Sequence, residues 1–421
     1  MADAPQLFSI RPGYPDFLEL PWTEPLAEWQ ARGAPIEYVP IGICRHPVIF
    51  VRVGGQLYAL KELPDSLAAK EYQLLRRFEE MDLPAVIAVG HVGLQRDSES
   101  LSVLITRYLE YALPYRLLFV QPELDSYREH LLDAMASLLV QLHLSGVFWG
   151  DCSLSNALFR QDAGRLQAYL VDAETSEVHE SLSDGLRSHE LDLMEENISG
   201  SLADLAAAGE LPADYPIFET GASIRERYVR LWDEINQAEK IAGDQKYRIQ
   251  ERIRKLNGLG FSVDEVLLRP VAGGDQLQFR VMVTDRHFHK NLLQGLTGLA
   301  AEEQQARILI NEIQEVRAGL SQKQNRSMPL SLAASQWLSQ TYQPLVQSLE
   351  APVATETVPA DEAAPAASAP PSFSPLELYC LMLEHKWYLS EAAKQDVGHQ
   401  KALDDFLTQV LPKRQRDQPL I

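Results

Sequence analysis

The stretch LHLSGVFWGDCSLSNALF, residues 142–159, constrains the fold more than any other part of the chain. It overlaps the end of a segment, Ser126–Val147, whose apolar pattern predicts a buried helix. It then places Asp151 and Asn156 five positions apart, with no charged residue between them. A capped turn is the ordinary interpretation, because Asp and Asn favour turns. A carboxylate that accepts a proton and a carboxamide that binds a divalent metal ion are also two parts of a phosphoryl-transfer site.

A short strand downstream supplies a third group. In LQAYLVDAET, residues 166–175, Leu166, Ala168 and Leu170 share a strand face with Asp172, which lies just before the strand pattern breaks. Carboxylate and carboxamide oxygens are hard ligands that suit Mg²⁺. Asp172 and Asn156 are therefore the candidate metal ligands.

A lysine and a glutamate upstream interrupt two apolar faces. In QLYALKEL, strand alternation puts Lys61 on the same face as apolar residues, and in the following helix Glu71 interrupts an apolar stripe. Either charge alone could reach water at the edge of the sheet. A buried lysine is costly unless it is paired, so we predict that the two form an ion pair. The apolar residues of the two faces are Leu57, Ala59, Leu63, Leu67, Leu74, Leu75 and Phe78.

The order of strand and helix patterns predicts an α+β chain with several units. At 421 residues, the chain exceeds the size of one hydrophobic core. We expect a lead-in at 1–36, a unit of antiparallel strands with one helix, beginning at Asp65 as N-cap, over 37–112, and a mainly α-helical unit over 113–220. We further expect an α+β unit over 221–350 and 375–412, interrupted by a disordered Ala/Pro-rich linker at 351–374.

Composition excludes some partners. The formal net charge of −21 repels nucleic acid and anionic membranes. The three cysteines, Cys44, Cys152 and Cys380, are far apart and have no metal-ligand spacing, so we expect a reducing, cytoplasmic location. We expect neither a secretory signal nor a transmembrane segment.

The candidate residues follow the chain order of the protein-kinase signature. The stretch 142–159 resembles the catalytic loop of the protein-kinase-like superfamily, with Leu142, His143, Gly146, Asp151 and Asn156 in register. Its Gly-Asp pair is similar to that of aminoglycoside phosphotransferases, Rio-type kinases and lipopolysaccharide core kinases. The resemblance covers roughly residues 37–205. The whole chain also resembles a bacterial, lipopolysaccharide-kinase-like family catalogued as a domain of unknown function.

This resemblance implies a two-lobed kinase-like fold, with an antiparallel β N-lobe and a mainly α C-lobe, that binds ATP and Mg²⁺. It implies that Lys61 binds the α- and β-phosphates and pairs with Glu71, that Asp151 is the base, and that Asn156 and Asp172 bind Mg²⁺. The remaining cofactor-binding candidates are Ala59 at the adenine pocket, the backbone around Glu110 in a hinge at 104–112, and Gly42, in a segment without a G-x-G-x-x-G pattern.

The sequence departs from the family at Trp149, where histidine is usual, and at VDAET, which replaces Asp-Phe-Gly.

Several other residues have two interpretations. Cys152, beside the proposed base, is either oxidisable or simply packed. The polar residues of RSHELDLMEEN, namely Arg187, Glu190 and Asp192, either support the loop or form a solvated helix face. The residues of DRHFHKN, namely Asp285, His287 and His289, either bind a metal ion or are ordinary histidines near a strand end.

Two functions remain open from the sequence. One is an Mg²⁺-dependent ATP phosphotransferase that acts on a hydroxyl of a sugar, glycolipid, small molecule or protein. The other is a nucleotide-binding regulatory module with weak or no catalysis. In either case the C-terminal unit could bind a protein partner.

Overall fold

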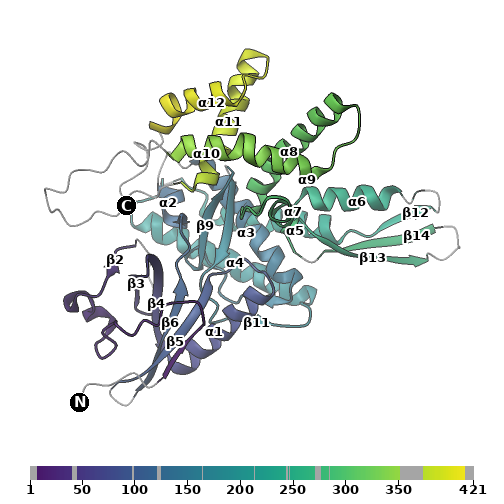
Figure 1. The fold of residues 1–421 in the computed structure, drawn as a ribbon. Coiled ribbons are helices and arrows are strands. Elements are labelled where there is room, and N and C mark those ends of the chain that lie inside the picture. Colours follow the sequence, from purple (N-terminus) through teal and green to yellow (C-terminus); the bar gives the residue numbers. More distant parts are fainter. Residues whose placement is uncertain are drawn as a thin grey trace, which may run out of the picture. The chain divides into compact units, whose positions relative to one another are not determined.

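The computed structural model describes most of the chain, in two units. The described residues are 7–39, 45–96, 99–120, 125–163, 165–212, 214–242, 245, 247–270, 276–283, 285–350 and 373–412. One compact unit comprises residues 1–160 and 168–231, and the other comprises 161–167 and 232–421. An antiparallel sheet comes first and helices dominate the remainder, which confirms the predicted α+β class (Figure 1).

The first unit opens with a six-stranded sheet in the order β1-β5-β6-β4-β3-β2. Each strand of this sheet is antiparallel to its neighbours, and in the centre Lys61 of β4 lies opposite Val48 of β3 and Leu104 of β6. The residues around it alternate between the two faces of the sheet, as predicted. The strands are β1 (Leu7–Ile10), β2 (Ile36–Glu37), β3 (Val48–Val53), β4 (Gln56–Pro64), β5 (Ile87–Arg96) and β6 (Glu99–Arg107).

Residues 7–36 do more than lead into the sheet. Strand β1 pairs with β5, and Phe17, Trp22 and Trp29 are buried in the core on one sheet face. The two tryptophan rings meet edge to face at 5.1 Å, and each indole N–H donates to a backbone carbonyl. Two short helical turns, η1 (Leu26–Glu28) and η2 (Gln30–Arg32), complete this segment. The proline content suggested a lead-in because prolines interrupt the strand pattern, although the aromatic residues between them fill a core.

Helix α1 (Asp65–Glu80) runs beside β4, β5 and β6 in the same unit (Figure 1). Its N-cap is Pro64 rather than Asp65, which instead accepts a hydrogen bond of 2.6 Å from the Ser102 hydroxyl. Its buried face carries Glu71, in line with the predicted stripe. The other buried residues of that face are Ala68, Leu75 and Phe78.

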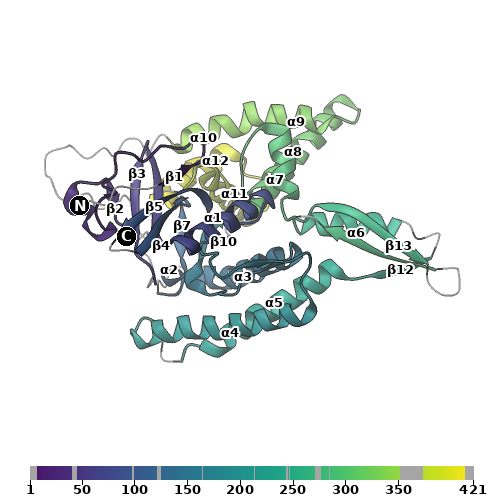
Figure 2. The ribbon, with the colours of Figure 1, turned by 90° about the horizontal axis from the view of Figure 1, so that it is seen from below.

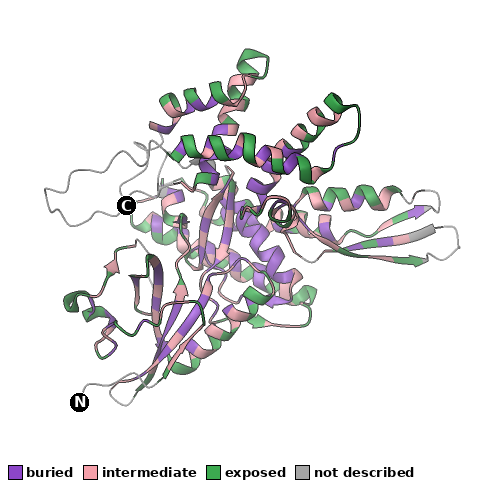
Figure 3. Cartoon of the chain, in the orientation of Figure 1, coloured by how far each residue is buried: buried purple, intermediate pink, exposed green. Residues whose placement is uncertain are grey.

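Helices dominate the rest of the first unit. Helix α3 is buried along most of its length (Figure 3), and α4 and α5 run side by side (Figure 2), joined by ion pairs from Arg225 to Asp192 and Glu195. Short strands form a β10-β9-β7 sheet and a β11-β8 pair. The elements are β7 (Ala112–Pro114), α2 (Tyr115–Val120), α3 (Asp125–Leu144), β8 (Val147–Phe148), η4 (Leu154–Asn156), β9 (Ala157–Asp162), β10 (Arg165–Leu170), β11 (Glu177–Val178), α4 (Asp184–Ala207) and α5 (Ile217–Asn236).

The second unit combines a three-stranded antiparallel sheet with a helical core. The sheet order is β12-β14-β13, and the helical core includes Trp337, Tyr379 and Phe406. The elements are β12 (Glu239–Ala242), α6 (Tyr247–Gly258), β13 (Val263–Pro270), β14 (Gln276–Val283), α7 (Phe288–Thr297), α8 (Glu303–Gln324), α9 (Leu330–Trp337), η5 (Leu338–Tyr342), α10 (Gln343–Glu350), α11 (Pro375–Ala393), α12 (His399–Asp405) and η7 (Phe406–Val410).

A partly buried carboxylate links four helices of this second unit. Glu312 of α8 accepts hydrogen bonds from the Trp337 indole of α9, the Tyr379 hydroxyl of α11 and His399 of α12, at 3.1, 2.7 and 2.7 Å. The predicted docking of the C-terminal helix is therefore realised within this unit. The predicted linker falls almost wholly on residues 351–372, which lie outside the described residues. Among the described residues, none of the helices combines the length and the apolar character needed to cross a membrane.

Candidate active site

Lys61 lies at the centre of a cluster of carboxylates in the first unit. Its ammonium nitrogen Nζ is 2.6 Å from Asp172 Oδ2, 3.1 Å from Glu71 Oε2 and 3.6 Å from Glu174 Oε2. Burial acts to lower the pKa of Lys61, but the charges of Glu71 and Asp172 outweigh it and raise that pKa above its ordinary value. The lysine therefore stays charged at neutral pH, and the predicted Lys61–Glu71 pair is present in the structure.

Glu71 reaches the cluster from the buried face of α1. Its side chain is 1 % exposed, and its second oxygen accepts a hydrogen bond of 3.4 Å from the Ala173 amide. Burial, followed by the nearby charge of Asp172, raises the pKa of Glu71 above its ordinary value, although Lys61 acts in the opposite direction. The site thus carries more negative charge than one ammonium compensates, which is an environment that favours a further cation.

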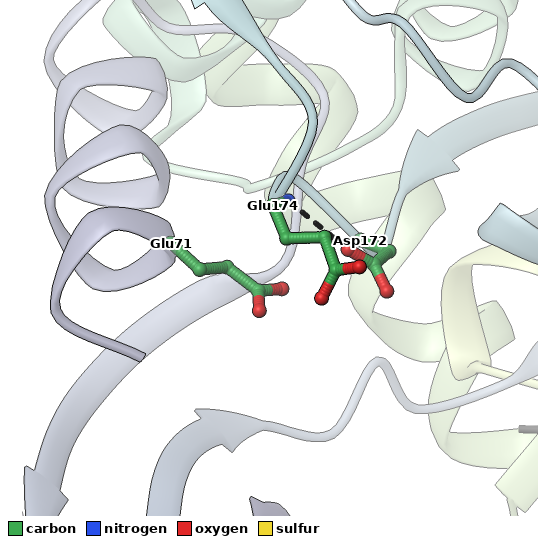
Figure 4. Close-up of side chains that lie close together, drawn as sticks. All are labelled: Glu71, Asp172 and Glu174. Carbon is green, nitrogen blue, oxygen red and sulfur yellow. Dashed lines mark hydrogen bonds between the residues drawn. The ribbon is translucent and has the colours of Figure 1, made fainter. Parts of the chain in front are cut away.

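Three carboxylates converge at this point (Figure 4). Oxygen atoms of Glu71, Asp172 and Glu174 all lie within 4.8 Å of one another. The Glu174 amide donates to Asp172 Oδ1 at 3.0 Å, so the turn after β10 holds these two side chains on the same side. Hard oxygen donors at this spacing fit a divalent cation such as Mg²⁺.

The loop that carries Asp151 is fastened to the end of β10. The Trp149 indole N–H donates to the Asp172 carbonyl at 3.1 Å, and the Val171 amide donates to the Asn156 carbonyl at 3.0 Å. Asn156 also donates through Nδ2 to the Asp151 carbonyl at 3.1 Å. These bonds bring the backbones of Asp151, Asn156 and Asp172 into one neighbourhood, and the joint role of their side chains stays a prediction.

Glu190 of α4 holds the same loop from behind. Its fully buried carboxylate accepts hydrogen bonds from the Trp149 and Gly150 amides at 2.6 and 2.7 Å, and it contacts His143 Nε2 at 2.6 Å. The φ of Gly150 is +84°, and a Cβ atom there would lie 3.0 Å from the Thr175 carbonyl oxygen. Of the three residues proposed to support the loop, Glu190 therefore does so.

Arg187 and Asp192 lie elsewhere on α4. Arg187 pairs with Asp184, and Asp192 pairs with Arg225 of α5. The predicted supporting role is thus carried by Glu190 among these three.

The predicted adenine-binding residues lie along β4 and the connection to β7. Ala59 is flanked in register by Phe50 and Thr106. Among the described residues, no hydrogen bond occupies the backbone groups of Glu110, whose exposed side chain accepts a bond of 3.1 Å from Gln56. Gly42 lies outside the described residues, as does Cys44.

Polar residues around the Glu174 carboxylate were not identified from the sequence. Glu174 follows Asp172 by two positions, and Arg45 and His46 approach its carboxylate at 3.9 and 3.7 Å. Glu174 lies in VDAET, the segment that replaces Asp-Phe-Gly. A second acidic residue there could have been considered a further metal ligand. Arg45 and His46 belong to the GICRHP segment, in which only a glycine pattern was sought.

Two secondary predictions have ordinary structural explanations. His289 is buried and contacts Glu303 at 2.6 Å, whereas His287 Nδ1 lies 4.0 Å from Asp285. The contact with Glu303 gives His289 an ordinary structural role, and a metal site at DRHFHKN stays an untested alternative. Cys152 is buried, and burial raises the pKa of its thiol, which supports the packed interpretation.

Comparison with known proteins matches two segments of the chain to two different families, much as the structure divides into two units. Residues 51–209 match the lipopolysaccharide kinase (Kdo/WaaP) family, and residues 230–411 match a domain of unknown function (DUF4032). The second match begins two positions before residue 232, where the longer segment of the second structural unit starts. Residues 51–209 are therefore similar to kinases of the lipopolysaccharide kinase (Kdo/WaaP) family.

A solved structure of WaaP in complex with acyl carrier protein is similar at 16% identity over 53% of this chain and 88% of that chain, with a TM-score of 0.34. No curated protein matches the chain.

Proposed function

We propose that the kinase-like domain is an Mg²⁺-dependent phosphotransferase that moves the γ-phosphoryl group of ATP to a hydroxyl group. The observation that carries this proposal is the position of Lys61, which contacts Glu71 and Asp172 together, while hydrogen bonds tie the Asp172 backbone to the loop of Asp151. A phosphoryl-transfer site needs this combination of a cation, metal ligands and a base around one point.

Each residue has a separate task in this proposal. Lys61, positioned by Glu71, neutralises charge on the nucleotide phosphates. Asp172 and Asn156 hold Mg²⁺, and Glu174 is a further oxygen donor within reach of Asp172. Mg²⁺ supplies charge neutralisation on the phosphoryl oxygens. The Ala59 region and the backbone of Glu110 accommodate the adenine.

Asp151 receives the proton of the acceptor. As the acceptor oxygen forms its bond to the γ-phosphorus, the bond between that phosphorus and the ADP oxygen breaks, and the acceptor proton passes to the Asp151 carboxylate. The acceptor class remains a hydroxyl of a sugar, glycolipid, small molecule or protein. The matched family name favours a sugar of lipopolysaccharide type.

Turnover of ATP tests the proposal without knowledge of the acceptor, because water can replace it. Release of ADP is measured with and without Mg²⁺ for the wild type, Asp151→Asn and Asp172→Asn, with Asp204→Asn on an exposed part of α4 as the matched control. We expect the first two variants to lose roughly 10²-fold or more in rate. The control should match the wild type.

Two results would point elsewhere. ATP binding without Asp151-dependent turnover would favour the regulatory nucleotide-binding module. Absence of both binding and turnover would contradict a nucleotide site at Lys61 altogether. A protein partner for the C-terminal unit stays a prediction.

A further inference from the structure

A side chain from α4 contacts the carboxylate of the proposed base directly. Asn197 Nδ2 lies 3.1 Å from Asp151 Oδ1, although the two residues are 46 positions apart in the chain. An ionised carboxylate only accepts hydrogen bonds, so the NH₂ side of the amide must face it and Asn197 is the donor. The contact therefore fixes the orientation of the carboxylate as well as its position.

Helix α4 also contacts the Asp151 loop through a second residue, Glu190. Glu190 lies seven residues, or two helical turns, before Asn197, so both side chains project from one face of α4. Glu190 binds the amides of Trp149 and Gly150, directly before Asp151. The buried residues Met194 and Ile198 flank Asn197 on this face and anchor the helix beneath it. A rigid element thus holds the loop backbone and the reactive carboxylate together.

The remaining contacts leave one oxygen of Asp151 available. Asn156 binds the Asp151 carbonyl, and Asn197 binds Oδ1. Among the described residues, no hydrogen bond reaches Oδ2. This oxygen is the one that an acceptor hydroxyl can approach.

We infer that Asn197 is a positioning residue for phosphoryl transfer, which holds Asp151 so that Oδ2 receives the acceptor proton. This inference rests on the proposed function. In the step concerned, the bond from the acceptor oxygen to the γ-phosphorus forms, the bond from that phosphorus to the ADP oxygen breaks, and the proton moves to Oδ2. Asn197 itself neither gains nor loses a proton.

Two variants separate positioning from general stability. Asn197→Ala removes the donor, and we expect it to lower kcat of Mg²⁺-dependent ATP turnover by about 10-fold to 10²-fold with KM for ATP within about twofold, because the contact is made to the base and not to the nucleotide. Asn197→Asp places a second carboxylate against the first. Like charges that share a site hold a proton more tightly, so the acidic limb of its pH–rate profile should move to higher pH by about one unit.

Matched variants serve as controls. Glu196→Ala changes the adjacent exposed residue of α4 and should leave kcat and the pH profile unchanged. Asn197→Ser keeps a short donor and should recover part of the rate lost in Asn197→Ala. Melting temperatures of all the variants show whether each remains folded.

The outcomes distinguish this inference from the function on which it rests. A wild-type kcat in Asn197→Ala, or an unshifted pH profile in folded Asn197→Asp, would overturn the positioning role while Asp151-dependent turnover stood. Absence of Asp151-dependent turnover in the wild type would overturn the proposed function, and this inference with it.

Discussion

At the scale of single residues, the lysine and its buried partner depend on each other. Lys61 contacts Glu71, whose side chain is almost fully buried. Removing one member of a buried ion pair leaves an uncompensated group and costs about 3–5 kcal/mol, whereas removing both can be nearly neutral. We therefore expect Lys61→Met to be less stable than the double variant Lys61→Met/Glu71→Gln. Melting temperatures test this order, and a double variant less stable than Lys61→Met would contradict the pairing.

Asp162 should give the second unit a measurable pH dependence. Burial outweighs the hydrogen bonds from the Gln304 and Gln305 amides and raises the pKa of Asp162 to about 6. The folded state then binds a proton that the unfolded state has already released, so stability falls as pH rises from about 4 to about 6. The effect is about 3 kcal/mol in total.

Asp162→Asn removes this titration and is the direct comparison. Wild type should lose stability relative to the variant between pH 4 and 6, and the difference should be constant above that window. The free energy of unfolding at several pH values measures it. A difference that stays flat across the window would show that Asp162 titrates normally.

Residues that act through strand alternation or helix spacing could be predicted. Lys61, Glu71 and Asp172 each interrupt or end an apolar pattern, so the sequence predicted the strand or helix face on which each side chain lies. Asn197 and Glu174 could not be predicted in this way, since a polar residue on a helix or after a strand is usually solvated. Only the tertiary fold shows that Asn197 contacts the Asp151 carboxylate and that Glu174 lies close to Asp172 and Glu71.

At the scale of elements, the turn at Gly150 controls how the loop meets the segment after β10. Its positive φ and the close Thr175 carbonyl leave no room for a side chain. We expect Gly150→Ala to destabilise the protein by about 1–3 kcal/mol, which lowers the melting temperature by several degrees, and to reduce ATP turnover. Gly185→Ala is the matched control, because nothing lies within 4 Å of a Cβ atom there. Equal melting temperatures for the two variants would contradict the strain at Gly150.

The order of strands and helices could largely be predicted from the sequence. The predicted sheet, the helix after it and the mainly α-helical part all occur, because their apolar periods are strong. The segment 1–36 was misjudged, since its packing depends on aromatic residues scattered between prolines. The histidines of DRHFHKN were also ambiguous, because local sequence does not reveal that Glu303 lies against His289.

At the scale of the whole molecule, the two structural units are not continuous segments of the chain, and the sequence alone did not predict this. Residues 161–167 belong to the second unit, although the residues before and after them in the chain belong to the first unit. Within the second unit, the Asp162 carboxylate accepts hydrogen bonds from the Gln304 and Gln305 amides at the start of α8. The formal net charge of −21 adds a further constraint, because an acidic protein that binds ATP must gather cations locally. In the proposed function, Lys61 and a divalent cation held by the neighbouring carboxylates would meet that requirement.

Calorimetric titration with ATP tests this account most directly. Wild type and Asp172→Asn are each titrated in the presence of Mg²⁺ and in the presence of a chelator. We predict that Mg²⁺ tightens ATP binding to the wild type by about tenfold or more, equivalent to about 1.4 kcal/mol, and that Asp172→Asn loses this gain. ATP affinity that is indifferent to Mg²⁺, or a metal-dependent gain that is undiminished in Asp172→Asn, would contradict the existence of a metal–nucleotide site at these residues.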